Sequence, residues 1–316
     1  MSPRYGPPDA LSAPRYSGIR TFARCPHVDD PDGVEVAVVG VPFDTATSYR
    51  PGARFGPEAI RAGSVLLRPF HPVHGIDVFG TLSVADWGDL DTTPGNAERT
   101  AGQIAEGLGP LVRAGVIPIV LGGDHSITLG ALRAQAAARG PLALVLLDAH
   151  ADTWDSYYGE RFFHGTHFRR AVEEGLLRPE RSLIAGLRGS LYEAGDLESA
   201  AQLGFELVRS DDLRAMTAER FGARVRDRVG DAPTYLSFDI DVIDPAFAPG
   251  TGTPEVAGLS SHEALALIRS LAGIPFGGFD LVEVAPPYDG PGQTTAMLAA
   301  NVAYEFLALV ALARSS

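Results

Sequence analysis

The sequence predicts an α/β fold, a three-layer sandwich in which helices cover both faces of a central, mainly parallel β-sheet. Short apolar segments of strand length alternate with longer segments of helical periodicity along the chain. Polar residues follow directly after three of the apolar segments, and ligands bind at the carboxyl ends of strands in such sheets. No linker interrupts the pattern. We therefore expect one domain over residues 34–316, preceded by a proline-rich, extended arm at residues 1–33.

Each expected element rests on a local pattern. Runs of Val, Ile and Leu are typical of strands buried on both faces, and they predict strands at 34–41, 82–86, 116–121, 144–148, 182–187, 205–208, 235–241 and 279–284. Apolar residues spaced three or four apart predict helices, which we expect after Pro57, at 97–114, from a cap at Ser126 to 138, and at 168–174, 216–229 and 296–313. Pro57 suits the first position of a helix.

Composition limits the class of protein. The chain has 316 residues, of which 45% are hydrophobic and 21% charged, as in ordinary soluble globular proteins. Its net charge of −13 argues against nucleic acid as a partner. Cys25 is the only cysteine, so internal disulfides and thiolate metal sites are excluded. We expect a cytoplasmic protein, with neither a signal peptide nor a membrane-spanning run.

The segment from Leu144 to Asp152 carries the first candidate metal ligands. After its apolar half, Asp148, His150 and Asp152 alternate with small residues. Side chains at alternate positions of a strand point to one side, so two carboxylates and an imidazole are expected to converge. Buried carboxylates this close must take up protons or bind a cation, and the imidazole between them favours a divalent metal.

Two further segments end in the same way. The strand at 116–121 stops at two glycines and is followed by His125. The strand from Tyr235 leads into Asp239 and Asp241, whose side chains are expected on one face because alternate residues of a strand point the same way. Because strand ends meet at one crevice of a parallel sheet, all three segments are expected to build one site.

These residues resemble a known family. Gly-Gly-Asp-His-Ser at 122–126, Asp-Ala-His-Ala-Asp at 148–152, His-Gly-Thr at 164–166 and Ser-Phe-Asp-Ile-Asp-Val-Ile-Asp-Pro at 237–245 look like signatures of the ureohydrolases, which include arginase and agmatinase. The resemblance covers about residues 16–312 and is strongest to the agmatinase and guanidinobutyrase branch. It implies an arginase-like catalytic domain.

The resemblance also implies a centre of two Mn²⁺ ions per subunit. By analogy, one ion is held by His125, Asp148, Asp152 and Asp239, and the other by Asp148, His150, Asp239 and Asp241. Asp148 and Asp239 would bridge the ions. An oxygen-rich set with two imidazoles suits manganese, with cobalt and nickel as alternatives. A bridging water would lose a proton near neutral pH and attack the guanidinium carbon of the substrate, giving urea and an amine.

Three catalytic roles follow from the same resemblance. His164 matches the histidine that protonates the leaving amine, and Glu283 matches the carboxylate that holds the guanidinium by paired hydrogen bonds. Asp152 would also orient the attacking hydroxide. The family further implies a homo-trimer or homo-hexamer, with the N-terminal arm and the loop at 50–57 near subunit contacts.

Three classes of function are open at this point. A hydrolase of guanidino compounds is favoured. Another two-metal hydrolase, such as a phosphoesterase, would need cationic side chains around the metals, and the three metal segments contain no Arg or Lys. The third class is a non-catalytic, metal-stabilised scaffold or sensor, and the presence of a shuttle histidine together with a complete ligand set argues against it.

Within the first class, the tail of the substrate sets the specificity. The loop at 154–163 is aromatic, whereas arginase carries a polar loop there, so arginine is disfavoured. Agmatine, cleaved to putrescine and urea, is the first choice and 4-guanidinobutanoate the alternative. Asp155 and Glu160 would favour an ammonium tail, and Arg161 or Arg50 a carboxylate tail.

Overall fold

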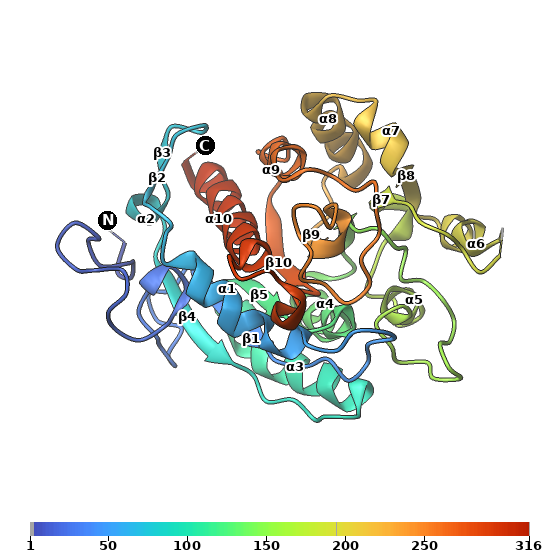
Figure 1. The fold of residues 1–316 in the computed structure, drawn as a ribbon, viewed down its shortest axis with the longest axis horizontal. Coiled ribbons are helices and arrows are strands. Elements are labelled where there is room, and N and C mark those ends of the chain that lie inside the picture. Colours follow the sequence, from blue (N-terminus) through green and yellow to red (C-terminus); the bar gives the residue numbers. More distant parts are fainter. Residues whose placement is uncertain (1–2, 194, 316) are drawn as a thin grey trace.

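The computed structural model describes residues 3–193 and 195–315 and shows the expected three-layer α/β arrangement (Figure 1). Its central sheet has eight strands in the order β4-β1-β5-β10-β9-β6-β7-β8, and every neighbouring pair is parallel. The strands are β1 (Val36–Val41), β4 (Val84–Asp89), β5 (Ile117–Gly122), β6 (Ala143–Leu147), β7 (Leu183–Leu187), β8 (Glu206–Arg209), β9 (Thr234–Asp239) and β10 (Phe276–Val282).

Helices cover both faces of this sheet (Figure 1). One layer holds α1 (Gly56–Ser64), α8 (Ala218–Val229), α9 (Ser261–Arg269) and α10 (Thr294–Ser315). The other holds α3 (Ala97–Arg113), α4 (Thr128–Arg139) and α5 (His167–Glu173). Strand β1 shows why both layers form: Val36 and Val38 belong to one apolar core, and Ala37 and Val39 to the other. Alternate side chains of a strand point to opposite faces, so an unbroken apolar run needs cover on both.

Shorter elements complete the chain. They are the antiparallel pair β2 (Phe70–His71) and β3 (Ile76–Asp77), the helices α2 (Val78–Thr81), α6 (Asp196–Gln202) and α7 (Ser210–Arg214), and the 3₁₀ helices η1 (Phe22–Arg24), η2 (Ala53–Phe55), η3 (His125–Ile127), η4 (Pro179–Arg181), η5 (Ile240–Val242) and η6 (Pro286–Tyr288).

The ends of several elements differ from the sequence-based expectation. Ser126 does not cap α4. Instead Asp124 accepts hydrogen bonds from the Ser126 backbone nitrogen and hydroxyl, and η3 precedes the helix. Helix α9 was not predicted, although Ser260 and Glu263 form a capping box at its start. The apolar residues after the box, at 264–268, are consecutive and therefore show no helical period in the sequence.

Helix α10 corrects the expectation that no apolar run reaches membrane-spanning length. It is long and apolar enough to cross a membrane, but 78% of its most apolar 18-residue window is buried inside the fold. It packs against α1, α9 and β10. We therefore interpret α10 as a core helix.

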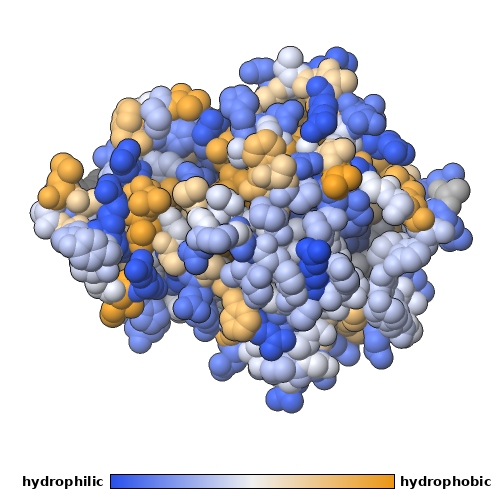
Figure 2. All heavy atoms as spheres, viewed as in Figure 1, coloured by the Kyte–Doolittle hydropathy of each residue, from blue (hydrophilic) through white to orange (hydrophobic). Residues whose placement is uncertain are grey.

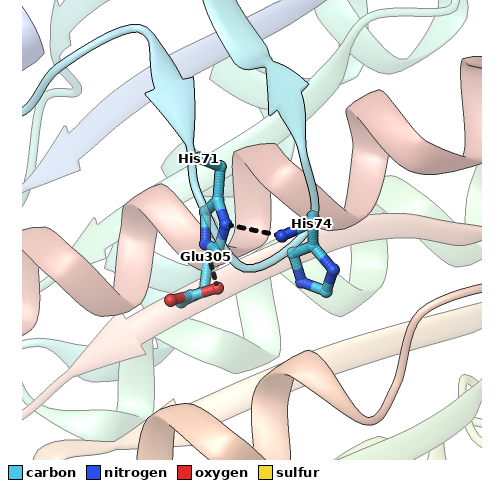
Figure 3. A group of neighbouring side chains, drawn as sticks. All are labelled: His71, His74 and Glu305. Atoms are coloured by element: carbon cyan, nitrogen blue, oxygen red, sulfur yellow. Dashed lines mark hydrogen bonds and ion pairs between the residues drawn. The ribbon is translucent and has the colours of Figure 1, made fainter.

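A buried polar group ties the β2–β3 hairpin to α10. The His71 Nε2 atom lies 2.9 Å from Glu305 Oε2, and the His74 backbone nitrogen donates to His71 Nδ1 at 3.3 Å (Figure 3). Arg269 of α9 donates twice to Glu305 Oε1, at 2.6 and 2.8 Å. The guanidinium neutralises the buried carboxylate, so a divalent ion added here would face an adjacent positive charge. We interpret the group as a structural link between three elements.

The N-terminal arm follows the chain's own surface over part of its length. The backbone nitrogen of Phe22 donates to Asp86 at 2.6 Å, and that of Ala23 donates to Ser64 at 2.7 Å. Figure 2 shows apolar residues gathered on the side where the arm and the β2–β3 hairpin lie. Exposed apolar side chains there include Leu11 and Phe70. Such patches are typical of contacts between chains, and the subunit contact implied by the resemblance stays a prediction.

Candidate metal centre and active site

The six candidate ligands converge at the carboxyl edge of the sheet, as the sequence predicts. Asp239 is the last residue of β9, the other five ligands follow the ends of β5, β6 and β9, and Glu283 follows β10, which lies between β5 and β9. The local reason differs from the expected one. Strand β6 ends at Leu147, and Asp241 lies in η5, so strand alternation does not align these side chains. They converge because irregular turns after adjacent parallel strands lead into a common space.

His125 lies among three carboxylates. Its Nδ1 atom is 3.1 Å from Asp148 Oδ2, 3.0 Å from Asp152 Oδ2 and 3.2 Å from Asp239 Oδ2. A single N–H can point at only one acceptor, and His125 Nδ1 makes no hydrogen bond of acceptable geometry with any of them. Four ligand atoms facing one another at such distances are suited to share a cation.

The other ring nitrogen of His125 fixes its tautomer. His125 Nε2 lies 2.9 Å from the Ser237 hydroxyl, which donates to Asp280 Oδ1 at 2.6 Å. Because the ionised Asp280 can only accept, the Ser237 proton is committed to it, and Ser237 must accept from His125 Nε2–H. In the neutral imidazole that binds a metal, the lone pair of His125 is therefore on Nδ1, facing the carboxylates. A histidine that donates its second N–H in this way is a typical metal ligand.

A second group lies on the other side of Asp148. His150 Nδ1 is 3.0 Å from Asp241 Oδ2 and 3.5 Å from Asp148 Oδ1. Asp148 thus presents Oδ2 to the His125 group and Oδ1 to the His150 group, which fits the bridging role expected of it. Asp239 faces His125 with Oδ2, while its Oδ1 accepts the Asp241 backbone N–H at 2.8 Å.

Burial and charge make this cluster unfavourable without a cation. Burial raises the pKa of Asp152 to about 6, and it raises the pKa of Asp239 well above its usual range, with nearby carboxylates adding to both shifts. Asp148 Oδ2 is buried and has no hydrogen-bond donor. Two divalent ions would balance four carboxylates and give this orphaned oxygen a partner. The donor set, oxygen-rich with two imidazoles, fits such ions.

His164 joins the metal cluster to a neighbouring loop. Its Nδ1 atom lies 3.0 Å from Glu283 Oε1, and its Nε2 atom accepts the Ser48 backbone N–H at 3.0 Å. Nδ1 therefore carries the proton and donates to Glu283. Burial lowers the pKa of His164, but the carboxylates of Glu283, Asp152 and Asp124 together outweigh burial, and the pKa is raised above its ordinary value. Within residues 3–193 and 195–315, the carboxylate that pairs with His164 is Glu283 and not a candidate metal ligand, and its role as a proton shuttle stays a prediction.

One carboxylate oxygen of Glu283 has no hydrogen-bond donor. Its Oε1 atom receives hydrogen bonds from the His125 backbone nitrogen, at 2.9 Å, and from His164, whereas its Oε2 atom is buried without a donor. Glu283 and Asp152 also have positive φ angles, of 62° and 51°. Non-glycine residues rarely adopt this conformation, and where it is held against its cost it often marks a functional site.

A cavity of about 620 Å³ opens over the cluster. Its floor includes His150, Asp152, Asp239 and Asp241, and its walls carry aromatic side chains and His164; those aromatic residues are Tyr49, Trp154, Tyr157, Tyr158 and Tyr192. The expected aromatic loop therefore lines the cavity at Trp154, Tyr157 and Tyr158. A small ligand with an apolar body and a polar head facing the metal cluster fits this lining.

Three residues of the site were not predicted from the sequence. His167 is buried with its ring 4.5 Å from that of His125, and its Nδ1–H donates to the His164 carbonyl at 2.8 Å. It could have been found, because it directly follows the quoted His-Gly-Thr motif. Ser237 and Asp280 lie within strands β9 and β10, where a polar residue gives no signal of its partner.

Comparison with known proteins decides the family. The Arginase family model matches residues 34–309, which is most of the chain. The chain belongs to the arginase family. Members of this family are ureohydrolases with a binuclear, typically manganese, centre, and the resemblance seen in the sequence is thereby confirmed.

Individual relatives place this arginase-family chain in one branch. It is 46% identical to a guanidinobutyrase of Pseudomonas aeruginosa, over 94% of both chains, and 45% identical to a mitochondrial agmatinase of Gallus gallus, over 96% of this chain and 89% of that one. The solved structure of proclavaminate amidino hydrolase from Streptomyces clavuligerus superposes with a TM-score of 0.90 at 42% identity, covering 95% of this chain and 100% of that one. The chain is similar to enzymes named for different substrates.

Proposed function

We propose that this ureohydrolase uses two Mn²⁺ ions, with cobalt or nickel as alternatives, to hydrolyse a small guanidino compound to urea and an amine. The observation that carries the proposal is the pair of ligand groups sharing Asp148, with the His125 lone pair fixed toward one of them. His125, Asp148, Asp152 and Asp239 would hold one ion, and Asp148, His150, Asp239 and Asp241 the other. When bound, the ions make water acidic enough to act as a nucleophile near neutral pH.

The remaining roles belong to the chain's own side chains. Glu283 Oε2, buried and without a donor, accepts an N–H of the substrate guanidinium and orients its carbon toward the ions. Asp152, at the floor of the cavity, orients the attacking water. His164 delivers a proton to the leaving amine, and Glu283 Oε1 supports the imidazolium that His164 forms between proton transfers.

One observation argues against the alternative two-metal hydrolase. Arg188, beside the metal cluster, donates from Nε and Nη2 to the carbonyl groups of Val256 and Glu255, at 3.0 and 2.7 Å. These carbonyl groups engage its Nε and Nη2 donors, so Arg188 does not offer them to a phosphate group bound at the ions. A guanidinium substrate brings its own positive charge and needs the free acceptor that Glu283 offers.

Product analysis tests the proposal. Manganese-loaded protein is incubated with agmatine, with 4-guanidinobutanoate and with p-nitrophenyl phosphate, and urea and phosphate are measured. We expect urea from a guanidino compound, loss of activity on chelation and its return with Mn²⁺. Phosphate release without urea would favour the other hydrolase, and neither product would favour the scaffold.

A further inference from the structure

Four charged residues could recognise the substrate tail by sequence alone, and the structure shows which of them line the cavity. Asp155 forms an ion pair with Arg170 at 2.7 Å, and Arg161 forms one with Glu173 at 2.7 Å. Neither of them lines the cavity, nor does Glu160. Arg50 does line it. One positively charged candidate therefore remains at the place where a substrate tail would lie.

The guanidinium of Arg50 has no anionic partner in residues 3–193 and 195–315. It lies over the rings of Tyr49 and Tyr288, 5.2 Å from each ring centroid, and no carboxylate of that part of the chain forms an ion pair with it. The face of a tyrosine ring attracts a cation and helps to orient it. This contact leaves the N–H groups of the guanidinium free to donate to another partner. Such a guanidinium is suited to bind a carboxylate by two parallel hydrogen bonds.

Two other charged groups of the cavity wall already have hydrogen-bond partners. The guanidinium of Arg188 donates to backbone carbonyls, and burial lowers its pKa although the carboxylates of Asp241, Asp148 and Glu255 lie nearby. The Asp196 carboxylate accepts the backbone N–H groups of Tyr192 and Glu193, at 2.9 and 3.2 Å. Among the arginines that line the cavity in residues 3–193 and 195–315, Arg50 is thus the one whose N–H groups are not committed to hydrogen bonds.

The loop that carries Arg50 is held at both ends. Buried Asp44 accepts the backbone N–H of Gly52 at 2.7 Å, and the Ser48 hydroxyl lies 2.8 Å from His164 Nε2. Arg50 is two residues beyond Ser48, a stretch of chain that spans at most about 7 Å. An extended chain of three methylene groups separates a guanidine carbon from a carboxylate carbon by about 6 Å at ordinary bond lengths. His164 and Arg50 line the same cavity, so a molecule of this length can lie between them.

We propose that Arg50 binds a carboxylate at the tail of the substrate, so that the substrates are guanidino acids such as 4-guanidinobutanoate. The inference rests on the proposed guanidino hydrolysis and adds the chemistry of the tail. It reverses the order suggested by the sequence, in which agmatine comes first. An ammonium tail would meet the unpaired guanidinium and be repelled.

A panel of three substrates with matched chains tests Arg50. Urea release is measured for 4-guanidinobutanoate, for agmatine and for butylguanidine, whose tail is uncharged, with manganese-loaded full-length protein. We expect the wild type to have its highest kcat/KM on the acid. Arg50→Gln should raise KM for the acid by about 10- to 100-fold, the usual effect of losing a charge-assisted hydrogen bond, with kcat nearly unchanged. Arg50→Lys should restore part of the loss.

Two controls separate tail recognition from a structural role. Butylguanidine should be hydrolysed equally by the wild type and Arg50→Gln, and Arg161→Gln, whose guanidinium is paired with Glu173 outside the cavity, should behave as the wild type on all three compounds. An equal loss on butylguanidine, or a wild type that prefers agmatine, would overturn the inference and leave guanidino hydrolysis standing. No urea from any of the three would overturn the proposed function itself.

Discussion

Ser237→Ala should weaken metal binding by removing a hydrogen-bond partner of His125, although the substitution replaces no metal ligand. The substitution removes the acceptor of His125 Nε2–H, at 2.9 Å, and the donor to Asp280 Oδ1, at 2.6 Å. Without Ser237, the imidazole is free to shift its proton to Nδ1 and lose the lone pair that faces the carboxylates. Losing such a partner of a ligand typically costs about 10- to 100-fold in metal affinity, equivalent to about 1.4–2.8 kcal/mol. Isothermal titration of Mn²⁺ into chelator-treated protein measures it.

Thr128→Val provides the matched control for Ser237→Ala. Thr128 also donates one hydroxyl hydrogen bond to Asp280, on Oδ2 at 2.8 Å, but Asp280 Oδ2 keeps a second donor in Tyr235 at 3.0 Å. We expect the free energy of unfolding of each variant to fall by about 1–3 kcal/mol, because the buried Asp280 carboxylate loses one hydrogen-bond donor. Only Ser237→Ala should lower the affinity for Mn²⁺. Wild-type affinity in Ser237→Ala, or an equal loss in Thr128→Val, would refute the argument that Ser237 sets the tautomer.

Three further predictions concern other residues. His164→Asn should retain both ions, measured by elemental analysis, while turnover falls by about 10²- to 10⁴-fold; loss of an ion would refute its assignment as shuttle. Burial raises the pKa of the Cys25 thiol, so a disulfide reagent should modify Cys25 only on unfolding. Burial lowers the pKa of His74, so the unfolded chain binds more protons than the folded chain. The free energy of unfolding, measured by urea denaturation, should therefore fall as the pH drops below about 6.5, and it should fall less in His74→Gln.

Much of the fold could be predicted because local pattern and tertiary structure agree. Apolar runs such as that of β1 need cover on both faces, and together with the alternation of strands and helices this requirement predicts a parallel sheet between two helical layers. The strand order could not be predicted. Strand β10, late in the chain, lies between β5 and β9, and no local pattern records which strands pair over such separations.

The sequence predicted which residues form the candidate site, but it predicted their geometry less well. Asp148, His150 and Asp152 were expected to alternate on a strand, but they lie beyond the end of β6, and Asp152 has a positive φ. Turn conformations of this kind depend on tertiary contacts that a sequence pattern does not contain. The same holds for the tail-binding group, since only the folded chain shows that Asp155 and Arg161 are paired elsewhere and Arg50 is not.

The dependence of urea release on bound Mn²⁺ tests the two-metal account most directly. Chelator-treated protein is titrated with Mn²⁺ at a protein concentration far above the dissociation constants, and the rate of urea release from a guanidino substrate is recorded at each addition. Two ligand groups sharing Asp148 predict that the rate rises until two equivalents per subunit are bound and then stays constant. A full rate with no metal, or with one equivalent, would contradict the account.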